Sequence, residues 1–159
     1  MKLLVISDTH HKTDLMQYAA AQCKPDAILH LGDHISDAYE LRRQFPAAAL
    51  YAVKGNCDFQ LGADTELLLT FEGVNIYMTH GHMFGVKSGL TSLIEGARRV
   101  RAGLALYGHT HKAALRQESG LWLMNPGQME RHDSSRAASY GIVNIDGDAF
   151  QCDIVCLPL

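Results

Sequence analysis

The chain has 159 residues, of which 47% are hydrophobic and 19% are charged, a composition that excludes intrinsic disorder and low-complexity fibres. Fourteen basic and seventeen acidic side chains give a net charge of -3, which excludes the strong basic excess typical of proteins that bind nucleic acid or anionic membranes. The length predicts one domain over residues 1–159. No apolar stretch is as long as a membrane helix or a signal-peptide core requires, so we expect a cytoplasmic protein.

The first third of the chain alternates predicted strands with predicted helices. Apolar runs predict strands over Lys2–Ser7, Ala27–Leu31 and Ala48–Val53, of which the first is expected to be covered on both faces and the second to be buried. Apolar residues at helical spacing predict helices over Thr13–Cys23 and Ser36–Phe45. This alternation is typical of a parallel sheet in an α/β fold.

The rest of the chain predicts mainly hairpins and one amphipathic helix. Glu72-Gly73 separates two strands in the manner of a two-residue hairpin turn. Asn125–Ser139 is polar and aperiodic, which predicts a long surface loop. A helix is expected over Ser88–Arg101, with Arg98, Arg99 and Arg101 on its solvated face. The further strands are expected over Glu66–Phe71, Val74–Met78, Leu104–Tyr107, Leu121–Met124, Tyr140–Ile145 and Phe150–Cys156.

Polar clusters follow five of the predicted strands, and they contain most of the nine histidines. They are Asp8-Thr9-His10, Gly32-Asp33, Gly55-Asn56, His80-Gly81-His82 and Gly108-His109-Thr110-His111. Strand ends along one edge of a sheet are where open α/β sheets assemble their sites, so we expect these clusters to converge. Each cluster alone is more often a cap, a turn or an incidental pattern than a functional site, but the ordered set indicates a metal site.

The donor types indicate two metal ions. Carboxylate, amide and imidazole groups without thiolates suit Mn²⁺, Fe, Co, Ni or Zn. One ion rarely takes more than about six ligands, and an activated water occupies one position, so seven donor side chains indicate a pair of ions. Asp33 is the natural shared ligand because its carboxylate has two oxygens.

The ordered set of motifs resembles that of the calcineurin-like metallophosphoesterase superfamily. In chain order the motifs are Asp-x-His, Gly-Asp, Gly-Asn-Cys-Asp, His-Gly-His and Gly-His-Thr-His. The short chain is similar to the small YfcE-like phosphodiesterases within this superfamily. The resemblance implies an α/β fold of four αββα layers, in which two mixed sheets pack face to face with helices outside and a dinuclear metal site at the C-terminal ends of strands. It also implies a ligand set of Asp8, His10 and His111 on one ion, Asn56, His80 and His109 on the other, and Asp33 on both.

The expected activity is hydrolysis of a small phosphodiester. A pair of divalent ions, Mn²⁺ in first place and Ni²⁺, Co²⁺, Fe²⁺ or Zn²⁺ as alternatives, activates a bridging hydroxide for in-line attack on phosphorus. Superfamily phosphatases commonly carry a proton-donating histidine after Gly-Asn, where this chain has Cys57. A thiol is a poorer acid at neutral pH, so we expect slow hydrolysis of poor leaving groups unless His82 or His11 substitutes. Asp58 is expected to orient a histidine or to hold the turn.

Other polar residues are weaker candidates. His30 lies inside an apolar strand and is expected to be a hydrogen-bonded core residue. Cys23, Cys152 and Cys156 are expected to be reduced, buried, apolar side chains. The candidates for contacts with substrate are His11, His34, Arg131, His132 and Arg136.

Three alternative functions remain open at this point. The first is a metal-free interaction scaffold, like the retromer subunit that resembles this fold, although all seven ligand types are retained here. The second is a phosphomonoesterase, because metal ligands do not distinguish monoesters from diesters. The third is a nuclease, which the lack of a basic stripe and of an aromatic stacking platform disfavours. Assembly into a homodimer or homotetramer is also open.

Overall fold

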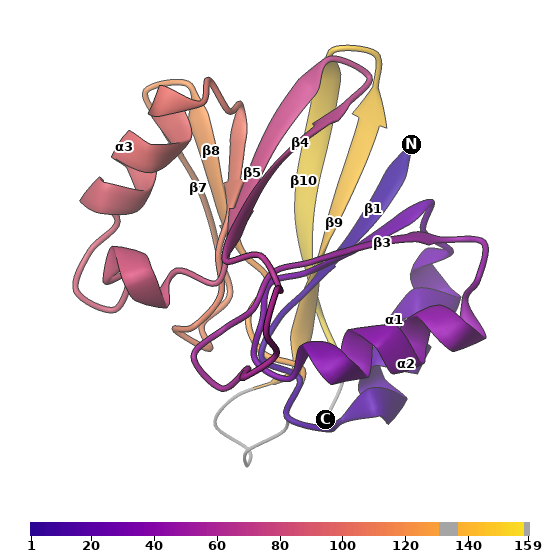
Figure 1. Cartoon of the computed structure of the whole chain (residues 1–159). Coiled ribbons are helices and arrows are strands. Elements are labelled where there is room, and N and C mark those ends of the chain that lie inside the picture. Colours follow the sequence, from indigo (N-terminus) through magenta and orange to yellow (C-terminus); the bar gives the residue numbers. More distant parts are fainter. Residues whose placement is uncertain (131–136, 158–159) are drawn as a thin grey trace.

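The structure is a computed structural model of the chain that describes residues 1–130 and 137–157, and these form two five-stranded sheets and three α-helices (Figure 1). The helices are α1 (Thr13–Cys23), α2 (Ile35–Gln44) and α3 (Thr91–Arg99), with a short 3₁₀ turn η1 (His82–Phe84). The strands are β1 (Lys2–Ile6), β2 (Ala27–His30), β3 (Ala49–Ala52), β4 (Glu66–Phe71), β5 (Val74–Thr79), β6 (Leu104–Leu106), β7 (Ala114–Glu118), β8 (Leu121–Asn125), β9 (Ser139–Asp146) and β10 (Ala149–Cys156). No helix of the described part is long and apolar enough to cross a membrane.

The first sheet contains the predicted βαβαβ unit. Its strand order is β10-β9-β1-β2-β3, with β1, β2 and β3 parallel and β9 antiparallel to β1. Strand β1 is apolar on both faces because Leu3 and Val5 point to the other sheet while Leu4 and Ile6 pack against α1. Strand β3 is an edge strand and is half-exposed.

The second sheet has the order β4-β5-β6-β8-β7. Strands β4 and β5 form the expected hairpin, β5, β6 and β8 are parallel, and β7 pairs antiparallel with β8. Helix α3 covers its outer face through Leu93, Ile94 and Ala97. Strand β7 was not predicted from the sequence.

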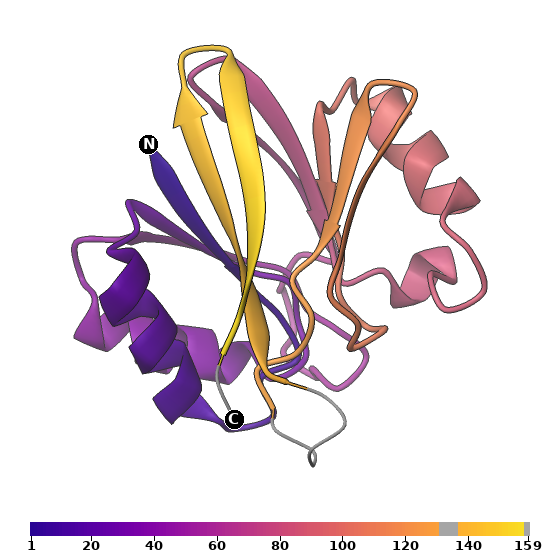
Figure 2. The same ribbon diagram turned by 180° about the vertical axis from the view of Figure 1, so that it is seen from behind.

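The two sheets pack face to face. Leu29 from one sheet and Ile76, Met78 and Leu106 from the other belong to one buried cluster, which is the central core. Figures 1 and 2 show α1 and α2 on one side of this pair of sheets and α3 on the other. The predicted four-layer αββα sandwich is therefore confirmed.

Two smaller expectations were wrong. Asn125–Met129 is buried rather than a surface loop, because the Asn125 amide donates to Gly108 O at 2.9 Å and ties the segment to the loop after β6. Cys156 is exposed, whereas Cys23 is buried and Cys152 is partly buried, and all four cysteines are free thiols as expected. The candidates Arg131, His132 and Arg136 lie outside the described residues.

Candidate metal centre

The candidate ligands lie where the C-terminal ends of strands from both sheets meet. Asp8 and Asp33 follow β1 and β2 in the first sheet, while His80 and His109 follow β5 and β6 in the second. Backbone hydrogen bonds join these loops, since Asp8 N donates to Gly32 O at 3.1 Å and Gly108 N donates to His80 O at 3.0 Å. His109 N donates to Asp8 Oδ2 at 3.2 Å and so links the two sheets.

The backbone at the candidate ligands is in an unfavourable conformation. Five of the seven have positive φ, which places them in the left-handed region: Asp8, His10, Asp33, His109 and His111. This conformation costs an L-residue about 1–2 kcal/mol. Such strain persists only where the surrounding structure imposes it, and it concentrates at functional sites.

Glycine lets the loops approach one another. Gly32 has a φ of +101°, and a Cβ there would lie 2.5 Å from Gly55 N and 3.0 Å from His80 Nδ1. A Cβ at Gly108 would overlap Ser7 Oγ and lie 2.9 Å from Asp8 Oδ2. Any side chain at these two positions would push the ligand-bearing loops apart.

One group of donors fits a first cation. One ligand atom each from Asp8, His10, Asp33 and His111 lies within 4.8 Å of all the others. Asp8 Oδ1 and His10 Nε2 are buried and have no hydrogen-bond partner among the described residues. His111 Nε2 lies 3.1 Å from Asp8 Oδ1. Two ligands about 2.1 Å from one ion and at right angles to it are about 3.0 Å apart, so this spacing suits a shared ion.

A second group of donors adjoins the first. His80 Nδ1 lies 2.8 Å from Leu31 O and donates to it, which leaves the lone pair of Nε2 free. That Nε2 lies 3.1 Å from Asn56 Oδ1 and 3.5 Å from Asp33 Oδ2, and the His109 ring is 5.1 Å away between centroids. With His80 neutral, these nitrogen and oxygen atoms are close enough to bind one cation together. Asp33 belongs to both groups.

Several pKa values are shifted at the centre. Burial lowers the pKa of His109 to about 4, and the charges of His80 and Lys87 act in the same direction. His109 is thus neutral, which is the form that binds a metal. Burial raises the pKa of Asp8, but His111, His80 and Ser7 more than offset it and bring the pKa below its ordinary value. The Ser7 hydroxyl donates to Asp8 Oδ2 at 2.6 Å.

Comparison with known proteins identifies the family. Residues 1–148 match the profile of the calcineurin-like phosphoesterase superfamily domain. The chain belongs to this superfamily. It is 36% identical over 152 residues to the probable metallophosphoesterase YsnB of Bacillus subtilis, an alignment that covers 94% of this chain and 87% of YsnB.

Solved structures agree with that assignment. A predicted phosphoesterase from Streptococcus pneumoniae superposes with a TM-score of 0.81 at 28% identity, covering 98% of this chain and 88% of its own. Vps29 of Entamoeba histolytica, crystallised with zinc, superposes with a TM-score of 0.77 at 20% identity, covering 98% and 99%. The second similarity shows the fold alone. The resemblance expected from the sequence is confirmed, and the protein is a metallophosphoesterase whose fold implies divalent metal ions.

Cys57, Asp58 and His82 lie beside the second donor group of this metallophosphoesterase. Cys57 N donates to Asp33 Oδ1 at 2.9 Å, and burial together with Asp33 raises the pKa of the Cys57 thiol. The His82 ring lies 5.4 Å from that of His80, and its buried Nδ1 has no partner among the described residues. Asp58 is buried and accepts from Gly55 N at 2.8 Å and from Ile35 N at 2.9 Å. Asp58 therefore contacts the turn after β3 and the start of α2.

His11 and His34 lie beside the first donor group. The His34 ring is 5.0 Å from His10 and 4.2 Å from His11. His11 is held by Asp37, whose Oδ2 accepts from His11 N at 2.9 Å and from the Thr9 hydroxyl at 2.7 Å. Sequence reasoning did not find Asp37, because nothing in its helical context distinguishes it from a solvated residue.

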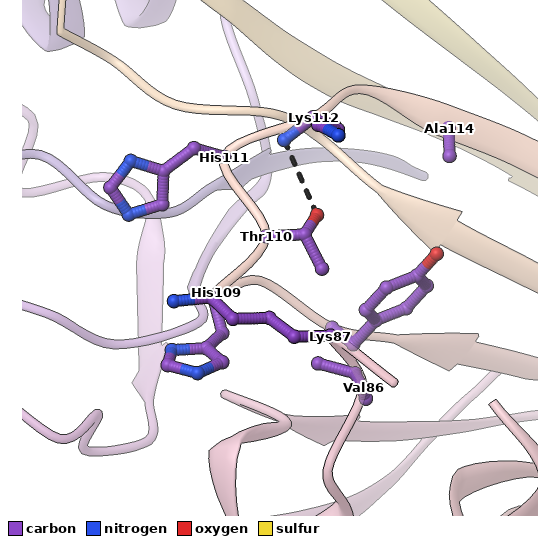
Figure 3. Close-up of a pocket in the computed structure, with 8 residues that line it drawn as sticks. Val86, Lys87, His109, Thr110, His111, Lys112 and Ala114 are labelled. Atoms are coloured by element: carbon purple, nitrogen blue, oxygen red, sulfur yellow. Dashed lines mark hydrogen bonds between the residues drawn. The ribbon is translucent and has the colours of Figure 1, made fainter. Parts of the chain in front are cut away.

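A cavity of about 550 Å³ opens next to His109 and His111 (Figure 3). Lys87, Tyr107 and Lys112 line it. None of these three was singled out from the sequence, since each lies between recognisable motifs.

Proposed function

We propose that this metallophosphoesterase hydrolyses a small phosphodiester and that it binds two divalent ions, Mn²⁺ in first place, through Asp8, His10, Asp33, Asn56, His80, His109 and His111. The observation that carries the proposal is the presence of two adjoining donor groups that share Asp33. The family membership supports phosphoester hydrolysis. The donor set, with its oxygen and nitrogen atoms and no committed thiolate, supports the choice of metal.

The ions, when bound, supply a hydroxide near neutral pH and shield the charge of the phosphate, which permits in-line attack on phosphorus. The chain's own residues prepare the centre for this reaction. Leu31 O fixes the His80 ring with Nε2 turned towards Asn56 and Asp33. Ser7 and the backbone of His109 hold Asp8 Oδ2, so that Oδ1 remains available.

Charge complementarity favours an anionic substrate. Asp8 and Asp33 contribute -2 against +4 from two divalent ions, so the loaded centre carries about +2. Lys54 and Lys87 add positive charge near His82 and His109. A phosphodiester is thereby drawn to the centre and held against it.

The proton for the leaving group has three candidate donors. The raised pKa of Cys57 keeps its thiol protonated at neutral pH, so it is able to donate but is a weak acid. His82 lies beside the second donor group, and His11 with His34 lies beside the first. We therefore retain Cys57 and His82 as candidate catalytic residues, and His11 and His34 as candidate substrate contacts.

A metal-free scaffold suits the centre less well. In that case His10 Nε2 and His82 Nδ1 would stay buried without hydrogen-bond partners among the described residues. Each such group destabilises a fold by about 1–3 kcal/mol. A structural role alone gives no reason to retain both.

Metal analysis combined with two chromogenic substrates tests the proposal. Protein loaded with Mn²⁺ and dialysed should retain two ions per chain and should hydrolyse bis(p-nitrophenyl) phosphate faster than p-nitrophenyl phosphate. Faster hydrolysis of the monoester would contradict the diester assignment, and fewer than one ion per chain without turnover would contradict the enzyme. The cytoplasmic location, the lack of a nucleic-acid partner, the single domain over residues 1–159 and assembly into a dimer or tetramer stay predictions.

A further inference from the structure

The cavity beside the metal centre has a composition of its own. It is lined by Val86, Lys87, Tyr107, His109, Thr110, His111, Lys112 and Ala114. His109 and His111 form the wall that it shares with the centre, and Figure 3 shows their rings on one side and Ala114 on the other. A group bound to the centre therefore has direct access to this space.

The cavity is positively charged. Lys87 and Lys112 are exposed, and none of the eight lining residues is acidic. Figure 3 shows the Lys87 side chain extending along His109, with its ammonium group on the side of the two imidazole rings. Lys87, His109 and His111 line the same cavity. The positive charge thus lies next to the position expected for the phosphate.

Neutral polar groups complete the lining. Tyr107 is mostly buried and lines the cavity, and its hydroxyl group is able to donate a hydrogen bond. Thr110 Oγ1 lies 3.0 Å from Asn125 Nδ2 and 3.3 Å from Lys112 N, both of which donate to it, so its own proton remains free for a ligand. Val86 and Ala114 add an apolar surface. The cavity therefore offers two ammonium groups and two hydroxyl donors around an apolar wall.

We propose that this cavity is the subsite for one ester group of the substrate, and that it selects an ester group carrying a second negative charge, such as a carboxylate or a further phosphate. The inference rests on the proposed function of the metal centre, because the phosphodiester itself binds there. Lys87 pairs with the second anionic group nearest the centre, and Lys112 contacts it from the outer part of the cavity. A volume of about 550 Å³ is within the range of pockets for small organic ligands and exceeds what a simple alcohol fills.

A pair of non-hydrolysable ligands tests the subsite. Phenylphosphonate and 4-carboxyphenylphosphonate share the phosphorus group and differ by one carboxylate. Calorimetric titration of the Mn²⁺-loaded wild type should show tighter binding of the carboxylated ligand by about fivefold, the effect of one partly exposed ion pair. Lys87→Gln should abolish this preference and Lys112→Gln should reduce it. The preference is the ratio of the affinities for the two ligands, so a loss of affinity for the phosphorus group that both share does not change it.

Lys24→Gln is the matched control, because Lys24 is also exposed but follows α1 at the opposite end of the first sheet. It removes the same charge and should leave the preference intact. Equal affinities for the two ligands in the wild type, or a preference that survives in the Lys87→Gln/Lys112→Gln double variant, would overturn the subsite alone. Absence of phosphonate binding, together with absence of bis(p-nitrophenyl) phosphate hydrolysis, would overturn the proposed function and the subsite with it.

Discussion

The buried His30 should make the stability of the fold depend on pH. Its Nδ1 accepts a hydrogen bond from Gly32 N at 3.2 Å, so the neutral ring carries its proton on Nε2, which lies 3.3 Å from the Thr9 hydroxyl. That hydroxyl in turn donates to Asp37 at 2.7 Å. Burial lowers the pKa of His30 to about 4, although the nearby carboxylates of Asp58, Asp37 and Asp8 oppose the shift.

The sign of the effect follows from the two pKa values. His30 takes up a proton near pH 6.5 in the unfolded chain and only near pH 4 in the folded chain. As the pH falls between these values, protonation stabilises the unfolded state and the free energy of unfolding decreases. The difference corresponds to about 3 kcal/mol of unfolding free energy, of which about 2 kcal/mol is lost by pH 5. Above pH 6.5 this contribution is fully present.

Urea denaturation at pH 7 and pH 5 measures this loss. EDTA in all samples removes the separate pH dependence of metal binding. His30→Asn offers an amide oxygen close to the position of Nδ1 and has no proton to take up, so the variant should lose about 2 kcal/mol less than the wild type between the two pH values. Equal losses in the two proteins would refute the assignment of a neutral, hydrogen-bonded His30.

Three further substitutions test the centre and its loops. Asp33→Asn should reduce bound Mn²⁺ from two ions to one or none per chain, because both donor groups share this carboxylate. Elemental analysis after dialysis measures the bound ions, and two retained ions would contradict the sharing. Cys57→His should raise the hydrolysis rate of alkyl relative to p-nitrophenyl leaving groups by at least about tenfold, and an unchanged ratio would count against a role for that position. Gly108→Ala should lower the free energy of unfolding by about 2 kcal/mol, because the new Cβ would overlap Ser7 Oγ. Urea denaturation measures this loss. Gly103→Ala is the control, because its Cβ would make only an ordinary contact of 3.6 Å with the Phe150 ring.

The sequence predicted the strands that are buried on both faces, because an uninterrupted apolar run marks such a strand. Strands β1 and β2 are apolar on both faces because one face meets the other sheet and the second meets helices, so uninterrupted apolar runs identified them. Strand β7, with the sequence Ala-Leu-Arg-Gln-Glu, is a mostly exposed edge strand and lacks any apolar pattern. Asn125–Met129 looked like a loop because its burial depends on hydrogen bonds from Asn125 to residues 15 and 17 positions earlier in the chain.

The candidate site could be predicted as far as it depends on strand ends. Asp8, Asp33 and His80 follow recognisable strands, so their convergence was expected, and the structure brings them together. Asp37 and Lys87 reach the site only through tertiary contacts from a helix and a loop that carry no motif. Local sequence contains no information on such contacts. The catalytic and ligand roles themselves stay predictions.

The left-handed backbone at Asp8, His10, Asp33, His109 and His111 has an evolutionary consequence. Replacement by glycine at these positions removes the steric penalty and abolishes the donor atom at the same time. In a descendant that is no longer selected for these donor atoms, replacement by glycine would therefore raise the free energy of unfolding. The same fold would then persist without the donor atoms. The surface at these strand ends would be free to bind other proteins.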